Sequence, residues 1–285
     1  MKAQHGCWFL LLWLLSSAQP LFASEPLKVH VQAAEGPFKS GFVNALQAGD
    51  PNIRIAPSGE HAELIVALGD EAFSRASRHD KPVLGVFVSR RLEEKLRRKG
   101  CHCAAIWAGV ALNDQLAMLQ LMMPVAAKVG VIIGKNSAWS EGSVKDYGGR
   151  LGLTLFRIDK PEELGRVLRE ELGALDALVL PVDEGLFGPD SAKLVLLTSY
   201  RQRRPVFGPE QSYVHAGSAA SLFASGGDLV SETLIQLDSF RARHRFRRSG
   251  FVHTPSVIVN EHVANSFDMR FHDSEALREA LEVMP

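Results

Sequence analysis

The sequence has 285 residues with 32 basic and 32 acidic side chains, and its pI is near 7.2. This balance argues against a nucleic-acid-binding protein, which usually carries a strongly basic face. The chain that follows a short N-terminal leader, about 260 residues, is long enough for one large or two modest domains with their own cores.

The N-terminus has the three parts of a secretory signal peptide. Lys2 supplies positive charge, a short apolar run follows, and small residues lie beyond Pro20. The run is shorter than the roughly 20 residues that cross a bilayer, and Pro20 would break a continuing helix. We expect residues 1–23 to be removed by cleavage near Ala23, which leaves a periplasmic protein. The alternatives are a buried N-terminal helix or a membrane anchor; Cys7 precedes the apolar run, so no lipid anchor is predicted.

Short apolar runs alternate with amphipathic patterns along the chain, which predicts strands followed by helices. In the first half we expect strands at 27–31, 53–56, 64–68, 82–88 and 104–107, and helices at 38–46, 71–78 and 91–98. In the second half we expect strands at 129–133, 153–158, 177–180, 205–208, 218–223 and 256–259. The helices predicted there are 113–123, 137–147, 161–172, 191–200, 228–242, 262–266 and 274–281, and the second of them is expected to begin at a cap formed by Ser137.

Continuously apolar strands that alternate with helices indicate parallel sheets covered on both faces. The strands fall into two similar runs, which fit two sheets better than one. The fold class predicted is therefore α/β with two Rossmann-like lobes, and the chain should pass from one to the other near residues 107–110.

Ligands of open parallel sheets bind beyond the carboxyl ends of the strands, where helix starts also offer free N–H groups. Polar residues at these positions are the candidate ligand-binding residues, namely Asp70, Ser89, Ser137, Asp183, Glu184, Glu210 and Ser212. Each has an alternative local role. Ser137 is also suited to an N-cap, Asp70 to a first helical turn, and the carboxylates of Asp183 and Glu184 to solvated turns.

Two cysteines remain after the predicted cleavage, Cys101 and Cys103. A disulfide between residues two apart on a strand would be strained, and one histidine between two thiols is too small a ligand set for zinc. An unreactive thiol pair, a strained disulfide and a metal fragment all stay open.

A cluster of cations at 241–248 is the exception to the neutral composition. It is compatible with a solvated helix end, where cations favour the macrodipole, and with docking to an anionic membrane or partner.

Signatures of catalysis are absent from the sequence. It has no Gly-x-Ser-x-Gly elbow, Walker loop, Gly-x-Gly-x-x-Gly after the first strand or His-Glu-x-x-His. Asp183 and Glu184 would suit acid–base chemistry only if they lie close together. We therefore expect no enzyme, and keep a periplasmic enzyme as the weaker alternative.

Several stretches in order resemble type I periplasmic solute-binding proteins of ABC transporters, in the branch related to tryptophan- and tyrosine-binding proteins. The matching stretches are 66–72, 81–88, 115–124, 128–133, 178–183, 204–208 and 257–260. The resemblance implies two lobes joined by three crossings, near 107–110, 220–225 and 252–256. The N-terminal lobe would comprise 24–108 plus 226–252, and the C-terminal lobe 109–225 plus 253–285.

The resemblance also implies a function. A monomer would capture a small organic solute in the cleft by hinge closure and deliver it to a membrane permease, without a metal or organic cofactor. An amino-acid-like or aromatic ligand would stack on nearby rings, for which the candidates are Phe207, Tyr213 and Phe223. The main alternative is a periplasmic sensor or accessory protein that acts on a membrane partner without transport.

Overall fold

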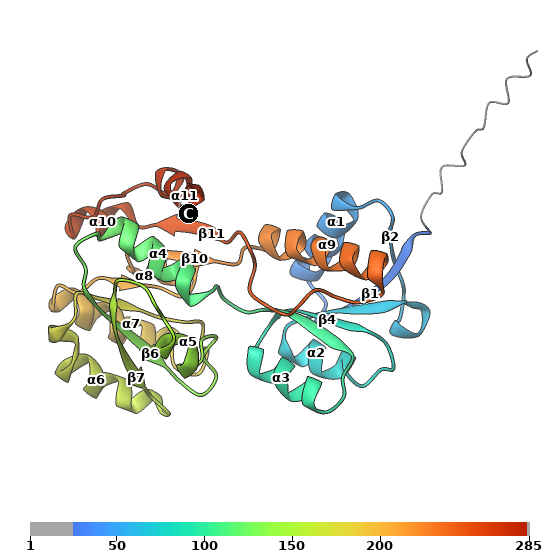
Figure 1. Cartoon of the computed structure of the whole chain (residues 1–285), viewed down its shortest axis with the longest axis horizontal. Coiled ribbons are helices and arrows are strands. Elements are labelled where there is room, and N and C mark those ends of the chain that lie inside the picture. Colours follow the sequence, from blue (N-terminus) through green and yellow to red (C-terminus); the bar gives the residue numbers. More distant parts are fainter. Residues whose placement is uncertain (1–24, 284–285) are drawn as a thin grey trace, which may run out of the picture.

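Residues 25–283 are described by a computed structural model, in which two α/β lobes lie side by side (Figure 1). The predicted signal peptide, 1–23, lies outside the described residues. Each lobe is built around its own sheet, as the two runs of apolar strands predict. Among the described helices, none is long and apolar enough to cross a membrane.

The first lobe contains a five-stranded parallel sheet in the order β2-β1-β3-β4-β5. Its strands are β1 (Leu27–Gln32), β2 (Ile53–Ile55), β3 (Leu64–Leu68), β4 (Val83–Val88) and β5 (Cys103–Trp107). Its helices are α1 (Pro37–Gly49), α2 (Asp70–Ala76), α3 (Arg90–Arg98) and, from late in the chain, α9 (Gly226–Arg243), with the 3-10 turn η1 (Gly59–His61) before β3.

The second lobe contains a six-stranded sheet in the order β11-β10-β9-β8-β6-β7. Its strands are β6 (Lys128–Ile133), β7 (Gly152–Arg157), β8 (Ala177–Val179), β9 (Val206–Phe207), β10 (Ala220–Phe223) and β11 (Ser256–Val259). Its helices are α4 (Leu112–Met122), α5 (Glu141–Lys145), α6 (Leu164–Glu170), α7 (Pro189–Arg201), α8 (Gln211–Ala216), α10 (Glu261–Ser266) and α11 (Ser274–Glu282), with 3-10 turns η2 (Pro161–Glu163) and η3 (Leu172–Ala174). β11 runs antiparallel to β10, so this sheet is mixed at one edge.

The two sheets share one winding order. The first strand of each lobe, β1 or β6, lies between the second and the third strand of that lobe. The chain therefore winds outward in both directions from this point, and a crevice opens beyond the carboxyl ends of β1 and β3 and of β6 and β8. Such switch points are where open α/β sheets bind ligands.

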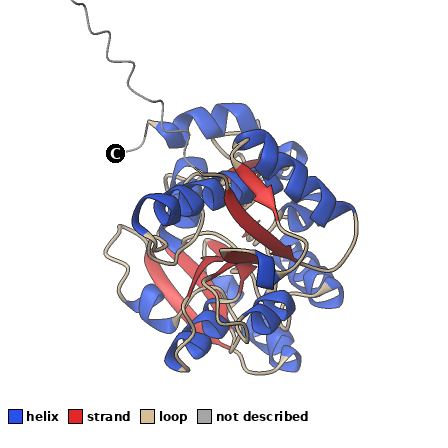
Figure 2. Ribbon diagram, turned by 90° about the vertical axis from the view of Figure 1, so that its right-hand side faces the viewer, coloured by secondary structure: helices blue, strands red, loops and turns tan. Residues whose placement is uncertain are grey.

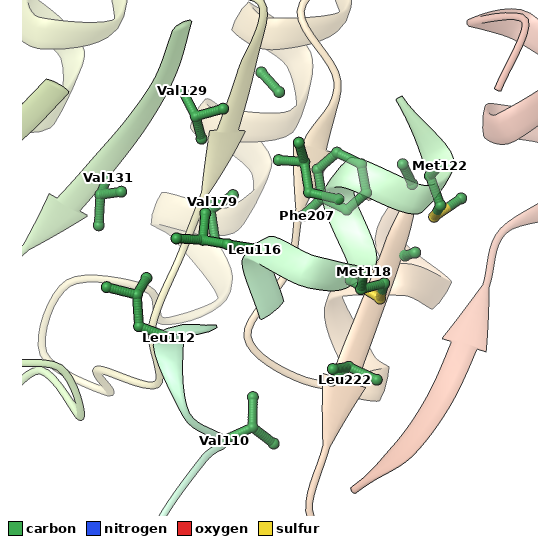
Figure 3. Close-up of a cluster of buried hydrophobic side chains, with 14 of the residues drawn as sticks. Val110, Leu112, Leu116, Met118, Met122, Val129, Val131, Val179, Phe207 and Leu222 are labelled. Carbon is green, nitrogen blue, oxygen red and sulfur yellow. The ribbon is translucent and has the colours of Figure 1, made fainter. Parts of the chain in front are cut away.

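Helices cover both faces of each sheet, as Figure 2 shows for the end of the molecule formed by the first lobe. In that lobe α1 and α9 pack on one face and α2 and α3 on the other. The close approach of α2 depends on Gly85 in β4, because a Cβ there would lie 2.9 Å from the Phe73 ring. In the second lobe a core of Leu116, Met118 and Phe207 lies between the sheet and α4 (Figure 3).

Three segments connect the lobes: the one after β5, the one between β10 and α9, and the one between α9 and β11. The last of these begins along the first sheet, where Gly250 pairs with Ile106 beside β5. It then enters the second sheet as β11. The crossings lie where the resemblance placed them, while the residue boundaries of the two domains stay a prediction.

Three local predictions are wrong. The helix predicted at 137–147 is only Glu141–Lys145, and its cap is Ser140, whose hydroxyl accepts from the N–H of Ser143 at 3.1 Å. The hydroxyl of Ser137 has a partner elsewhere in the lobe. The strand predicted at 205–208 is only two residues long, and the polar stretch after it forms the unpredicted helix α8.

Candidate functional site

A cleft lies between the lobes at the carboxyl ends of both sheets. Its main cavity has a volume of about 700 Å³ and takes its walls from the loops after β3 and β4 in the first lobe and after β6 and β8 in the second. A smaller cavity of about 300 Å³ continues toward the hinge and is lined by the loops after β9 and β10. Phe87 and Val182 line both cavities, which therefore form one continuous cleft.

The structure brings all seven predicted site residues to this region. Asp70, Ser89, Asp183 and Glu184 line the main cavity, and Glu210 and Ser212 line the smaller one. Ser137 lies beside the main cavity, in a neighbouring hollow of about 450 Å³. These residues were chosen only because each follows the carboxyl end of a predicted strand. They lie together because the parallel strands of each sheet end at the same edge.

Asp183 is the centre of a hydrogen-bonded network in the second lobe. It is only 5% exposed. Its Oδ2 accepts from the hydroxyl of Ser137 at 2.7 Å, and its Oδ1 accepts from the N–H groups of Gly185 and Leu186 at 3.1 and 3.2 Å. Ser137 in turn accepts from the N–H of Gly134 at 2.7 Å. The network joins the ends of β6 and β8 across the switch point, so Asp183 holds the shape of the cleft wall.

Glu184 and Glu210 form the acidic part of the second-lobe wall. Neither makes an ion pair with another residue of the described chain. Burial and the charge of Glu184 raise the pKa of Glu210, while a hydrogen bond from Ser212 opposes this rise. The two carboxylates are therefore close enough to repel, and a ligand ammonium group would relieve that repulsion.

The first-lobe wall is built from Asp70 and Ser89. The N–H and the hydroxyl of Ser89 donate to the two carboxylate oxygens of Asp70, both at 2.6 Å. The same hydroxyl accepts from the N–H of Leu92 at 3.4 Å and caps α3. Asp70 is exposed, and both residues of this pair line the main cavity.

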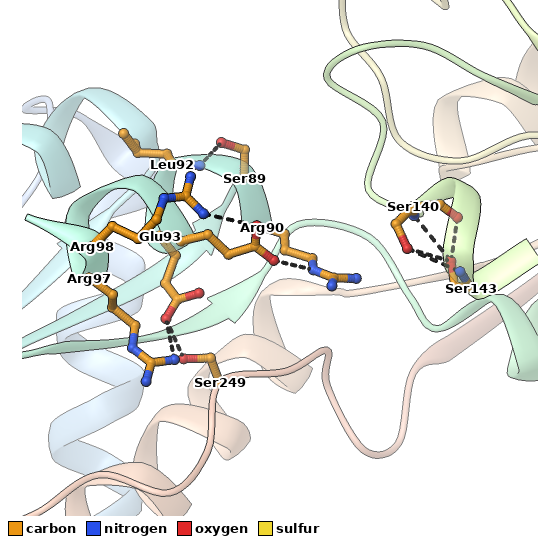
Figure 4. Close-up of polar contacts among 10 residues, drawn as sticks. Ser89, Arg90, Leu92, Glu93, Arg97, Arg98, Ser140, Ser143 and Ser249 are labelled. Atoms are coloured by element: carbon orange, nitrogen blue, oxygen red, sulfur yellow. Dashed lines mark hydrogen bonds and ion pairs between the residues drawn. The ribbon is translucent and has the colours of Figure 1, made fainter. Parts of the chain in front are cut away.

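Two arginines at the start of α3 extend from the first lobe toward the second. The guanidinium of Arg90 lies 5.0 Å from the centre of the Trp107 ring and donates to Glu94 at 2.8 Å, and Figure 4 shows it pointing toward the other lobe. Arg91 crosses the cleft and donates to the backbone oxygen of Lys135 at 3.3 Å and to Asn136 at 3.5 Å. Arg91 is thus a direct polar contact between the lobes at the rim of the cleft.

Phe87 has a backbone conformation that its residue type disfavours. Its φ is 54°, in the left-handed region, at a register shift between β4 and β5. Bulky residues adopt this conformation only where the surrounding structure enforces it, and such strain concentrates at functional sites. The sequence offers no signal for this residue beyond its place two positions before Ser89.

Comparisons with known proteins were made for the whole chain. No family model matches it, and no curated protein does. An ABC domain in complex with L-Trp from Streptococcus pneumonia is 15% identical, with a TM-score of 0.60 over 89% of this chain and 98% of that one. A ligand-free, open substrate-binding protein with adhesive properties from Clostridium difficile is 19% identical, with a TM-score of 0.64 over 86% and 96%. A conserved domain protein from Vibrio cholerae is 16% identical, with a TM-score of 0.57 over 88% and 97%.

This chain has the type I periplasmic-binding-protein fold. The similarity of fold extends over both lobes and the hinge, as the resemblance in sequence predicts.

The three aromatic residues predicted to stack on a ligand differ in how far they are exposed to the cleft. Phe207 is fully buried in the second-lobe core, so it is unavailable to a ligand and that prediction is wrong (Figure 3). Tyr213 is 5% exposed and donates to the backbone oxygen of Phe187 at 3.1 Å, inside its own lobe. Phe223 is half-buried and lines the smaller cavity. The rings that face the cleft are therefore Phe223 and Phe87.

An apolar hollow of about 590 Å³ opens beside the acidic loops. It lies between α7 and α8, and its floor includes Phe187, Leu196 and Tyr213. Glu184 and Glu210 line both this hollow and the cleft. Apolar and acidic surfaces therefore adjoin in the second lobe of this binding-protein fold.

Cys101 and Cys103 are both free thiols and lie far from the cleft, at the start of β5. The thiol of Cys103 donates to the backbone oxygen of Cys101 at 3.6 Å. Interaction with Cys101 and burial raise the pKa of Cys103, while the same thiol contact lowers the pKa of Cys101. Within residues 25–283, no three histidine, cysteine or acidic side chains gather as a metal site would require.

Proposed function

We propose that this protein captures a small organic solute between its lobes and serves as the periplasmic solute-binding component of an ABC-type transport system. One observation carries the proposal: the main cavity is lined by strand-end loops of both lobes, so a ligand there touches both at once. A ligand that contacts both lobes binds the closed form more tightly than the open one and shifts the population toward closure. A permease would then recognise the closed form.

The proposed contacts follow from the charges in the cleft. Glu184, Glu210 and Ser212 supply acceptors for ligand amine or hydroxyl groups. Arg90 and Arg91 supply donors for a carboxylate, and Phe87 and Phe223 supply ring faces. This pattern favours a zwitterionic ligand with an apolar part. The L-Trp complex of the Streptococcus domain accords with such a ligand and does not establish it for this chain.

A second candidate function is that of an accessory or sensor protein that acts on a membrane partner without transport. It is favoured because several polar groups of the cleft already have hydrogen-bond partners within this chain and do not need a ligand to supply them. Both oxygens of Asp183 and both oxygens of Asp70 already accept hydrogen bonds from their own lobe. The adhesive properties named for the Clostridium difficile protein show that this fold is also found in proteins with roles beyond solute capture.

The test is a thermal-shift screen of the purified protein against amino acids, aromatic acids, sugars and small peptides. A ligand at 100 times its dissociation constant adds about 2.7 kcal/mol to the free energy of unfolding. We expect a saturable shift that is reduced in Glu210→Gln and Ser212→Ala. The matched control is Glu162→Gln, an exposed acid outside the cleft, which should leave the shift unchanged.

Two results would decide against capture in this cleft. A well-folded protein that shifts with no compound points to the accessory role. A shift that survives both cleft variants would place the ligand elsewhere.

A further inference from the structure

Six arginines lie on the first lobe at the end opposite the cleft. They come from the last turn of α3 and from the end of α9 and the segment after it, and we call them the basic face: Arg97, Arg98, Arg243, Arg245, Arg247 and Arg248. All six are exposed, with Arg97 at 60% and Arg98 at 71%. The parallel strands of this lobe begin at this end, at the right of Figure 1, and their carboxyl ends point to the cleft.

A buried carboxylate joins the two stretches that carry these arginines. Glu93 is 1% exposed, and its Oε1 accepts from Arg97 at 3.5 Å and from the hydroxyl of Ser249 at 3.0 Å (Figure 4). Gly250 continues this segment along the edge of the first sheet, beside β5. These contacts bring the last turn of α3 beside the segment that follows α9, so cations far apart in the sequence become neighbours at this end of the lobe.

The positive charge of this surface is poorly compensated. Arg243, Arg245, Arg247 and Arg248 make no ion pair with any described residue, and the nearby acid Asp50 is already paired with Arg241. The whole chain has a formal net charge of zero, so the charge that balances these cations lies elsewhere on the molecule.

A helix end explains only part of the cluster. Arg241 and Arg243 lie in the last turn of α9, where they favour its dipole. The helix ends in a left-handed residue, His244, and the effect of the dipole falls off within the last turn. Arg245, Arg247 and Arg248 lie beyond that range, so the helix supplies no reason for them.

The shape of the surface indicates what it binds. The cleft and the hollows described above are not lined by these arginines, whereas a small anion is usually held in a hollow by convergent donors. Phe246 packs against Phe240 with ring centres 5.0 Å apart, so the ring within the segment faces the protein interior. The surface therefore offers dispersed charge and little apolar area.

We propose that the basic face docks the protein on an anionic lipid bilayer through the phosphates of its headgroups. Arg97 and Arg98 pair with Glu93 and Glu94 within α3, which leaves four arginines of the basic face without an ion pair in the described chain. An arginine next to an anionic surface strengthens binding by about five-fold, so these four together suffice for reversible attachment. Attachment at this end leaves the cleft, on the far side of the lobe, open to solutes. Docking does not depend on ligand capture and is tested without a ligand.

The experiment is sedimentation of the purified protein with vesicles of phosphatidylcholine alone, and with vesicles of phosphatidylcholine and phosphatidylglycerol in equal amounts. We expect binding only to the anionic vesicles, and its loss at about 0.5 M salt, where charges are screened within a few ångströms. These two comparisons use the unaltered protein and need no variant to fold. Changing Arg243, Arg245, Arg247 and Arg248 to Gln should lower the partition coefficient by at least about a hundred-fold.

The matched control removes four exposed cations of the second lobe by changing Arg150, Lys160, Arg169 and Arg201 to Gln. It has the same net charge as the basic-face variant and should keep most of the binding. Equal losses in both variants would mean that net charge alone is responsible and would overturn the proposal. Failure to bind anionic vesicles overturns it as well, and binding to soluble polyglutamate in that case would identify an acidic protein as the partner.

Discussion

In each lobe an aspartate follows the third strand of the sheet, but one aspartate is exposed and the other is buried. Asp70 follows β3, the third strand of the first sheet, and Asp183 follows β8, the third strand of the second. Asp70 is exposed and bonded to Ser89, which follows the next strand outward. Asp183 is buried and bonded to Ser137, which follows β6, the first strand of that lobe.

The choice of partner determines which residues stay available to a ligand. In the first lobe the residue after β4, Ser89, is used by Asp70. In the second lobe the acid after β9 is Glu210, which makes no ion pair with any described residue and lies beside Ser212 of α8. In the second lobe the hydrogen bonds of Asp183 therefore fix the loops at the ends of β6 and β8, while the carboxylates of Glu184 and Glu210 stay available to a ligand. We expect these two acids to contribute most of the ligand selectivity.

The largest expected effect tests this difference in burial. Asp183→Ala leaves the N–H of Gly185 and the hydroxyl of Ser137 without their acceptor, while the N–H of Leu186 keeps the backbone oxygen of residue 183. The variant should lower the free energy of unfolding by about 3 kcal/mol. Asp70→Ala, at the matching position, should cost about 1 kcal/mol or less because water replaces the lost partner. Urea unfolding measures both, and equal losses would contradict the contrast between the lobes.

The next effect concerns the strained backbone of the first-lobe wall. At Phe87 the Gly variant should be more stable than the Ala variant by about 1 kcal/mol, because only glycine adopts a positive φ without steric cost. Val131, in the middle of β6, is the control. There Val131→Ala should be more stable than Val131→Gly by about 0.5–1 kcal/mol. Thermal unfolding of the four variants checks whether the order reverses between the two strands.

A smaller effect depends on pH and concerns the acids of the second-lobe wall. Because the pKa of Glu210 is raised in the folded protein, the ionised form is disfavoured there, and stability is lost as the pH rises from the unfolded value of 4.5 through the folded pKa. Glu210→Gln should therefore stabilise the protein at pH 7, by less than about 1 kcal/mol for this partly exposed group, and lose that advantage below about pH 4.5. A gain that is independent of pH would argue against this account.

The smallest expected effect concerns the contact between the lobes. Arg91→Ala removes the donor to Lys135 and Asn136, an exposed interaction worth under about 1 kcal/mol. We expect a small shift of the ligand-free protein toward a wider cleft, seen as a larger radius of gyration in X-ray scattering. Arg75→Ala, which breaks an ion pair with Glu71 inside the first lobe, should leave the radius unchanged.

The positions of the strands could be predicted because they depend on short apolar runs. Leu64–Leu68 is buried along almost its whole length, and such a run is readable without knowledge of its neighbours. The rule for strand ends then gathered Asp70, Ser89, Asp183 and Glu184 at one cavity. The antiparallel direction of β11 has no local signal, because hydrogen bonding to β10 alone determines it.

The caps and the rings could not be predicted from local patterns. Ser137 and Ser140 are equally good caps in sequence, and the choice was made by Asp183, which lies far along the chain and binds Ser137. Phe207 and Phe223 are both aromatic residues near strand ends, yet the covering helix α4 buries one ring completely and leaves the other half-exposed.

By itself, the sequence determined the alternation of strands and helices, the presence of two sheets and the set of polar residues at their carboxyl ends. These features depend on hydrophobic patterns within short windows, where backbone geometry and burial of apolar area dominate. Only the tertiary structure decided which carboxylates are buried, which backbone is strained at Phe87, and which distant arginines share a surface. Those outcomes depend on contacts between residues far apart in the chain, and these contacts form only when the lobes fold.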